Sequence, residues 1–150
     1  MQAQLRKRKE GFTIIEVLIV LAIAGLILLV VFLAVPALQR NSRNTQRKSE
    51  VASIVGAINE YSNNNGGKLP TSAQLASAVQ NAKLSFYEAG GVTAASSDTN
   101  GATTETVQVR LQAKCGTNGN ASSGSASARQ FAVMYNVETG GGEQKLCQDS

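Results

Sequence analysis

The side chain with the most unusual chemistry in this sequence of 150 residues is Glu16, a carboxylic acid inside a long apolar run. Between Phe12 and Val35, the only other residues that are not hydrophobic are Thr13 and Gly25. A carboxylate inside a membrane-spanning helix costs a few kcal/mol. Glu16 therefore indicates a function or a partner, unless it lies near the membrane interface and reaches water.

Other reactive groups are scarce. The chain has no histidine, which is the commonest general base and metal ligand. The glycines at 140–142 indicate a turn, because no strand-then-helix phosphate cradle surrounds them. Asp98 and Asp149 are too isolated in sequence to indicate a calcium site. We therefore expect no enzyme activity, no metal and no cofactor.

The apolar run predicts a helix that spans a membrane. Its 24 residues, Phe12 to Val35, would extend about 36 Å as a helix at roughly 1.5 Å per residue, and a hydrocarbon core is about 30 Å thick. A secretory signal peptide is the alternative, because Ala37 provides a passable cleavage site. The run is long for a signal peptide, however, and Glu16 has no use in one.

The charges are unevenly distributed. Residues 1–11 hold four basic residues and one acid, and Arg40, Arg43, Arg47 and Lys48 follow the apolar run. We interpret the second group as a solvated collar facing lipid headgroups, in preference to a specific DNA or partner site. From Ser49 onward, eight acids exceed six basic residues. This mildly acidic part gives no reason to expect nucleic-acid binding.

The helix is expected to continue over residues 36–63 as an amphipathic helix. Apolar residues recur there at spacings of three and four: Val51, Ile54, Val55, Ile58 and Tyr61. The stretch NNNGG then favours a helix end. Residues 64–150 predict a head with a short helix capped by Thr71 or Ser72, in which Leu75, Ala76 and Val79 face inward.

Three strands are expected in the head. TETVQVRLQAKC alternates apolar and polar residues. RQFAVMYNVE predicts a second strand with Phe131, Val133, Tyr135 and Val137 on one face, and QKLCQD predicts a third after a turn. The first is expected to end at Cys115. Residues 90–104, rich in Gly, Ala, Ser and Thr, predict an exposed loop. The fold class is therefore α+β, with a long N-terminal helix packed on a small antiparallel sheet.

The N-terminal motifs together resemble the type IV prepilin signature, which pilins share with secretion-system pseudopilins. The resemblance rests on a basic leader, the sequence KEG and then FTIIEVLIVLAIAGL, and it covers residues 6 to about 35. It implies that residues 1–11 are a cytoplasmic leader, that a membrane peptidase cuts after Gly11, and that Phe12 becomes the methylated first residue. Glu16 matches the family's acid, four residues after the new N-terminus.

The resemblance gives Glu16 a physical role. Cleavage would create a positive amine on Phe12, and Glu16 lies about 6 Å further along the helix. A neighbouring subunit's amine could approach Glu16 where lone charges are poorly solvated and opposite charges attract strongly. We expect Glu16 to set the register between subunits while the apolar surface of residues 12–35 supplies the adhesion.

The resemblance also suggests points of flexibility. Gly25 lies where pilins commonly have a helix-loosening glycine, but Pro36 comes about one turn later than their usual proline. Proline lacks an N–H and clashes with the preceding turn, so a kink or local melting is expected near Phe32 to Pro36.

The two cysteines, Cys115 and Cys147, are expected to pair if the head lies outside the cytoplasm, and the resemblance places it there. Paired cysteines near the C-terminus are frequent in pilins. A bridge would close a loop of about thirty residues and stabilise the head by roughly 3–4 kcal/mol. Two free thiols in a reducing compartment are the alternative.

The function implied is that of a type IV pilus subunit, for adhesion, motility or DNA uptake. Its implied partners are copies of itself or other pilins, the prepilin peptidase, a membrane assembly platform, a motor ATPase and, before assembly, membrane lipid. The alternatives are a pseudopilin of a type II secretion or competence system, a binding module that captures DNA or a host ligand, and an unrelated single-pass protein. The mildly acidic part of the chain from Ser49 onward argues against DNA.

Overall fold

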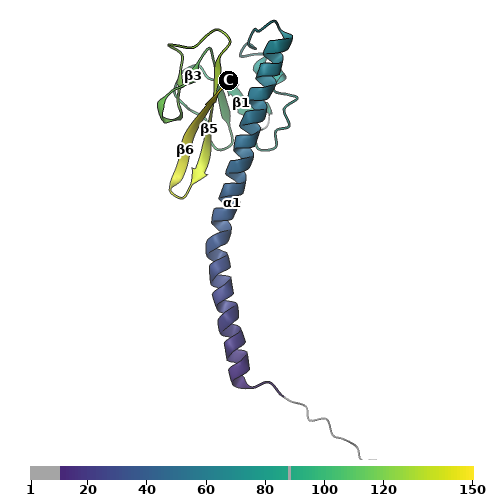
Figure 1. The fold of residues 1–150 in the computed structure, drawn as a ribbon, viewed down its shortest axis with the longest axis vertical. Helices are drawn as coiled ribbons and strands as arrows, with labels where there is room; N and C mark the ends of the chain where they lie inside the picture. The colour runs from purple at the N-terminus through teal and green to yellow at the C-terminus, as the bar shows by residue number, and fades with distance from the viewer. Residues whose placement is uncertain (1–10, 88) are drawn as a thin grey trace, which may run out of the picture. The chain divides into compact units, whose positions relative to one another are not determined.

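The structure is a computed structural model that describes residues 11–150 apart from Glu88. The chain divides into two compact units, one ending at Leu38 and one from Gln39 to Ser150, which is the head. The elements in chain order are α1 (Ile14–Asn64), α2 (Leu75–Ala78), η1 (Ala89–Gly91), β1 (Val92–Ala94), β2 (Val107–Leu111), β3 (Lys114–Cys115), η2 (Thr117–Gly119), β4 (Ala121–Ser122), β5 (Phe131–Thr139) and β6 (Gly142–Asp149) (Figure 1).

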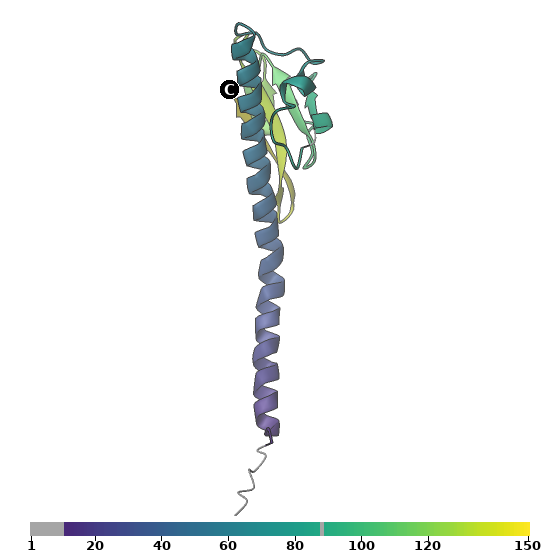
Figure 2. The same cartoon turned by 90° about the vertical axis from the view of Figure 1, so that its right-hand side faces the viewer.

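The α+β layout expected from the sequence is confirmed, since the second half of α1 packs along the sheet of the head (Figure 2). Four residues of the predicted apolar stripe are buried, Val51, Ile54, Val55 and Ile58, and Tyr61 is half-buried. The helix ends at Asn64, where Gly66 and Gly67 follow with φ of 65° and 81°. Those values favour glycine, because a side chain is strained in the left-handed region.

The sheet has four strands in the order β1-β2-β5-β6, in place of the three expected. The three predicted strands β2, β5 and β6 pair antiparallel, with Val109 opposite Val133 and Tyr135 opposite Leu146. The fourth strand, β1, pairs in parallel with β2 and comes from the segment that was expected to be an exposed loop. Three residues are too few to show the alternation that reveals a strand.

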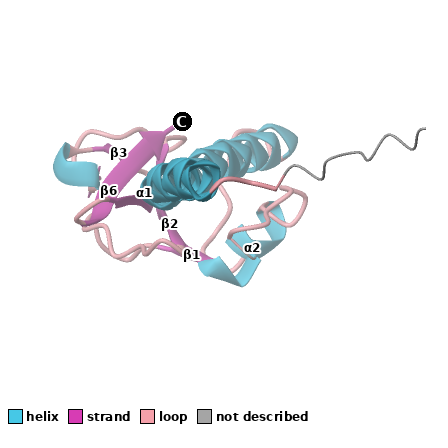
Figure 3. Ribbon diagram, turned by 90° about the horizontal axis from the view of Figure 1, so that it is seen from below, coloured by secondary structure: helices cyan, strands magenta, loops and turns pink. Residues whose placement is uncertain are grey.

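Two further expectations about the head are wrong in detail. Cys115 does not end β2, because the chain turns at Gln112, whose φ is 53°, and Cys115 lies in β3, paired with β4. The short helix begins at Leu75 without a side-chain cap, and the Thr71 hydroxyl donates to the Gln74 side chain instead. In Figure 3, α2 lies next to β1. Leu75 and Val79 are buried as expected, whereas Ala76 is exposed.

Strand β5 has a core on each face. Phe131, Val133, Tyr135 and Val137 pack with the stripe of α1 in the larger core. Ala132 and Met134, on the opposite face, pack with alanines of the β3–β4 region and with both cysteines in a much smaller core. The small side chains of that second core bury little apolar area, so it gains most from a covalent cross-link.

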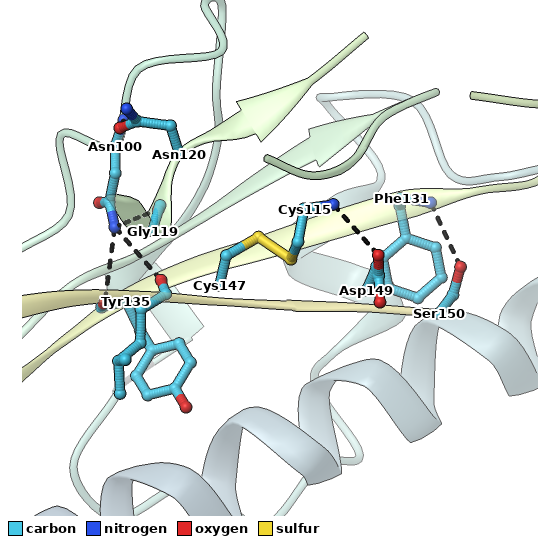
Figure 4. Close-up of a disulfide and its surroundings, with 10 residues drawn as sticks. Asn100, Cys115, Gly119, Asn120, Phe131, Tyr135, Cys147, Asp149 and Ser150 are labelled. Atoms are coloured by element: carbon cyan, nitrogen blue, oxygen red, sulfur yellow. Dashed lines mark hydrogen bonds between the residues drawn. A yellow bond between two sulfur atoms is a disulfide. The ribbon is translucent and has the colours of Figure 1, made fainter. Parts of the chain in front are cut away.

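Cys115 and Cys147 supply that cross-link, as expected, and the disulfide joins β3 to β6 with 5.6 Å between the Cα atoms (Figure 4). The Cys115 N–H also donates to a carboxylate oxygen of Asp149, at 3.1 Å. Asn100, which is 1% exposed, donates through Nδ2 to the carbonyls of Gly119, Tyr135 and Leu146. These contacts tie the 90–104 segment and the β3–β4 hairpin to the sheet.

The basic residues after the apolar run bind the head, and the solvated collar is therefore wrong for most of them. Both Arg43 and Arg47 form ion pairs with Glu138, at 2.5 and 2.8 Å. Arg47 is buried, and its guanidinium stacks 4.8 Å from the centre of the Phe86 ring. Arg40 donates to the Thr139 carbonyl at 3.1 Å. The end of β5 is thus fixed to the first turns of α1 in the head.

A second carboxylate, one turn further along α1, fixes another segment of the head to the helix. Glu50 is 5% exposed and accepts the N–H groups of Ser85, Phe86 and Tyr87. Burial alone would raise the pKa of Glu50, but the hydrogen bonds from Tyr87, Ser85 and Phe86 outweigh it and lower that pKa. Glu50 therefore stays charged and holds the loop before β1 against the helix.

The ion pairs of Glu138 predict how the stability of the head depends on pH. Hydrogen bonds from Arg43 and then Arg47 lower the pKa of Glu138 from 4.5 to about 2. A carboxylate whose pKa is lower in the folded state than in the unfolded state stabilises the folded state fully above the unfolded-state pKa. For Glu138, this stabilisation of the head is lost as the pH falls from 4.5 toward 2. Glu138→Gln should lower the melting temperature at pH 7 by roughly 5–10 °C. The difference in melting temperature between the variant and the wild type should become smaller as the pH falls toward 2.

The measurement is near-ultraviolet circular dichroism of the full chain in detergent between pH 7 and pH 2. Glu105→Gln is the matched control, because Glu105 is exposed and belongs to none of the three ion pairs of the described residues. A Glu138→Gln variant that melts with the wild type at pH 7 would contradict the role given to these ion pairs.

Candidate assembly site on the N-terminal helix

The start of α1 is built around Thr13 and Glu16. The N–H and the hydroxyl of Thr13 both donate to Oε2 of Glu16, each at 2.8 Å, and the Glu16 N–H donates back to the Thr13 hydroxyl at 3.3 Å. This reciprocal pattern is a capping box, in which two side chains satisfy N–H groups that the first helical turn leaves free. Glu16 is therefore held in one orientation by its own helix.

Thr13 was not among the site residues expected from the sequence. The signal was present in TIIE, because Thr followed three residues later by Glu before an apolar run is the usual sequence of a capping box. The box uses Oε2 of Glu16, and no hydrogen bond reaches Oε1 from any residue in the described part of the chain. One carboxylate oxygen thus remains able to accept a further donor.

The box does not depend on the peptide bond between Gly11 and Phe12. The donors belong to Thr13, one residue beyond that bond, so cleavage there would leave the Thr13 amide and hydroxyl unchanged. Gly11 itself has no atom within 4 Å of the place where a Cβ would stand. The bond before Phe12 therefore lies in open chain, three residues before the first residue of α1.

The surface behind Glu16 is apolar on all sides. Every exposed large hydrophobic side chain of the described residues lies between Phe12 and Leu38, with exposed fractions from 38% at Val35 to 89% at Phe12. α1 is long and apolar enough to cross a membrane, and none of its apolar window is buried. A helix that is hydrophobic all round needs lipid or other helices about it.

A shallow hollow of about 520 Å³ lies on this helix beside the acid, lined by Phe12, Glu16, Val17, Val20 and Leu21. It combines an apolar floor with a carboxylate at its edge. Such a surface suits a group that is itself apolar and carries a positive charge, because both kinds of contact are then satisfied together.

Gly25 and Pro36 both lie inside α1, and the helix is continuous from Ile14 to Asn64. Nothing in the described chain stands within 4 Å of a Cβ at Gly25. Local melting near Phe32 to Pro36 is therefore not seen in this structure. A kink there, and a role for Gly25 and Pro36 in flexing an assembled helix, stay predictions.

The potential metal ligands of the head are scattered among its described residues. No cluster of three or more potential metal-ligating side chains occurs there. Asp98 accepts from Arg110 at 2.9 Å and from the N–H and hydroxyl of Ser123, and Asp149 accepts from Cys115. The two aspartates considered for calcium are thus occupied in structural hydrogen bonds.

Comparison with known proteins agrees with this location of the site. The family model described as the prokaryotic N-terminal methylation motif matches residues 6–32. The match contains Gly11, Phe12, Thr13 and Glu16, and the basic leader residues before Gly11 lie outside the described residues. No curated protein and no solved structure matches the chain.

Proposed function

We propose that this chain is a structural subunit of a type IV pilus. The premise is that it carries the prepilin-type methylation motif and is a precursor of the type IV pilin or pseudopilin kind. The observation that carries the proposal is the lone carboxylate of Glu16, oriented by Thr13 in an otherwise apolar exposed helix. In a simple membrane anchor the acid would serve only to cap the helix, and the cap leaves Oε1 of Glu16 unused.

The proposed mechanism begins with removal of residues 1–11 by the prepilin peptidase, followed by methylation of the Phe12 amine. The amine of one subunit then pairs with Oε1 of Glu16 on the next, while Oε2 keeps its bonds to Thr13. In apolar surroundings such a pair is favourable only in one geometry, so it sets the axial offset between helices.

The apolar residues 12–35 would leave the lipid and form the core of the fibre, with the heads outside it. The partners of this proposal are other copies of the chain or other pilins, a membrane assembly platform and a motor ATPase. Before assembly the subunit would be a single-pass protein of the cytoplasmic membrane with its head outside, and afterwards part of an extracellular pilus. Adhesion, motility and DNA uptake are the roles available to such a fibre.

A pseudopilin of a type II secretion or competence system is the second candidate, because the methylation motif matched at residues 6–32 is common to both classes. Electron microscopy of cells expressing the chain separates them. Long surface fibres that contain the chain would support a pilin, and expression without such fibres would support a pseudopilin.

Mass spectrometry of the mature N-terminus tests the shared chemistry. We expect the protein from membranes or from sheared surface material to begin at Phe12 and to carry one methyl group on its amine. An intact Met1, or a chain that begins after Ala37, would contradict the proposal, because the amine required by Glu16 would not exist.

A further inference from the structure

A groove of about 620 Å³ lies where the chain leaves α1, between residues 66–72 and the residues around Leu111 and Arg129. Its volume falls within the range of small-molecule sites, about 300–1,000 Å³. Leu69, Pro70 and Leu111 give it apolar walls, and polar groups stand among them. None of these residues belongs to the assembly site.

The Arg129 side chain lines this groove beside Gly67. A Cβ at Gly67 would stand 2.6 Å from Cζ of Arg129, so the guanidinium lies directly against the glycine backbone. Gly67 also has a φ of 81°, a value that residues other than glycine rarely adopt. The left-handed backbone of Gly67 therefore favours glycine, and the loop after α1 lies against the guanidinium of Arg129 at the groove.

The groove is cationic although the part of the chain from Ser49 onward carries more acids than basic residues. Lys68 and Arg129 both line it and both are exposed, and no acid is among its lining residues in the described chain. Neither cation belongs to the three ion pairs of the described residues. An anion could therefore bind there without first displacing a carboxylate.

Most acids of the head are already used elsewhere. Glu50 accepts three backbone N–H groups, Asp98 and Glu138 pair with arginines, Glu143 accepts from Asn136, and Asp149 accepts from Cys115. The net charge that argued against binding of a polyanion thus resides in groups committed to structure. The local charge at the groove decides what can bind there, because exposed charges are screened within about 10 Å.

The other polar groups of the groove indicate the class of anion. Thr71, Ser72 and Gln112 supply hydroxyl and amide groups, and the walls are aliphatic. No aromatic ring is among the lining residues that the structure describes, so nucleobases would have no surface to stack on. We propose that this groove binds a carboxylate-bearing sugar of an acidic polysaccharide, with the carboxylate at Arg129 and Lys68.

Arg129 suits that role because a guanidinium binds a carboxylate through two parallel hydrogen bonds. The hydroxyls and amide of the groove would pair with sugar hydroxyls, and Leu69 and Leu111 would contact the C–H face of the ring. This function is independent of fibre assembly, because every group involved lies in the head.

The test uses the full chain in detergent, with polygalacturonate as the acidic polysaccharide, dextran as the neutral one, and single-stranded DNA as a different polyanion. We expect binding to polygalacturonate that weakens with salt, and little binding to dextran. Arg129→Gln and Lys68→Gln should each weaken it about tenfold. Lys48→Gln is the matched control, because Lys48 is an exposed lysine of α1 outside the groove.

Three results would overturn the proposal. The first is equal binding to polygalacturonate and dextran, and the second is a loss with Lys48→Gln as large as that with Lys68→Gln. The third is tighter binding of DNA than of polygalacturonate with the same dependence on Arg129. Because the assay needs neither cleavage nor fibres, its failure would leave the mature N-terminus and the assembly proposal untouched.

Discussion

Glu16→Leu should leave synthesis, membrane insertion and leader cleavage unchanged and reduce the yield of assembled fibres by about tenfold or more. The substitution removes the only acid of the apolar run. In the proposed mechanism, it would leave the Phe12 amine of each neighbour without its partner. Leaving one charge of a buried pair unpaired costs about 3–5 kcal/mol, and about 1.4 kcal/mol corresponds to a factor of ten. Sheared fibres and membrane fractions are compared by immunoblot.

Two further variants separate assembly from helix capping. Thr13→Val removes the side chain that orients Glu16 but keeps the carboxylate, so it should reduce fibre yield much less than Glu16→Leu. Glu60→Leu makes the same chemical change at an exposed acid in the head half of α1 and should assemble normally. Normal fibre yield from Glu16→Leu would show that the acid does not set the register. Equal losses from Thr13→Val and Glu16→Leu would assign the acid to capping alone.

Gly11→Leu should lower the processed fraction of the chain more than about tenfold, since a peptidase that accepts glycine before the cut must accommodate the new side chain in its own site. The chain itself would tolerate the change, because nothing lies within 4 Å of a Cβ at Gly11. The block is therefore expected in processing and not in folding. Intact mass of the membrane-bound protein measures it directly, since the precursor retains residues 1–11.

Gly124→Leu is the control for a bulky residue at an open glycine, because a Cβ at Gly124 also meets no atom within 4 Å. That variant should be cleaved like the wild type. A Gly11→Leu protein whose N-terminus is still a methylated Phe12 would contradict the assignment of the cleavage point.

Much of the fold could be predicted because its elements have local patterns. The stripe from Val51 to Ile58 repeats with the helical period and β2 alternates, so each shows which face is buried. β5 is buried on both faces, so its apolar sequence indicates a strand without showing which face meets α1. β1 could not be predicted, because it is three residues long and owes its place to pairing with β2. The same holds for β3 and β4, two residues each, separated from β2 by the left-handed turn at Gln112.

The charges of the head were the least predictable feature. Arg43 and Glu138 are 95 residues apart in the chain, and nothing near either residue in sequence indicates its partner. The arginines after the apolar run were therefore interpreted from their neighbourhood, as a collar facing lipid. In the structure, Arg43 and Arg47 instead form ion pairs with the carboxylate of Glu138. A net charge summed along the sequence therefore says little about which charged side chains remain unpaired.

The sequence by itself determined the N-terminal features of this protein: the methylation motif that contains Gly11 and Phe12, the lone acid and an apolar run long enough to span a membrane. Those features lie next to one another in the sequence, so they can be identified from the spacing of residues along the chain alone. Only the tertiary structure decided the parallel strand β1, the ion pairs of Arg43 and Arg47 with Glu138, and the cationic groove beside Gly67. Each of these arises from groups far apart in the chain that meet only when the head has folded.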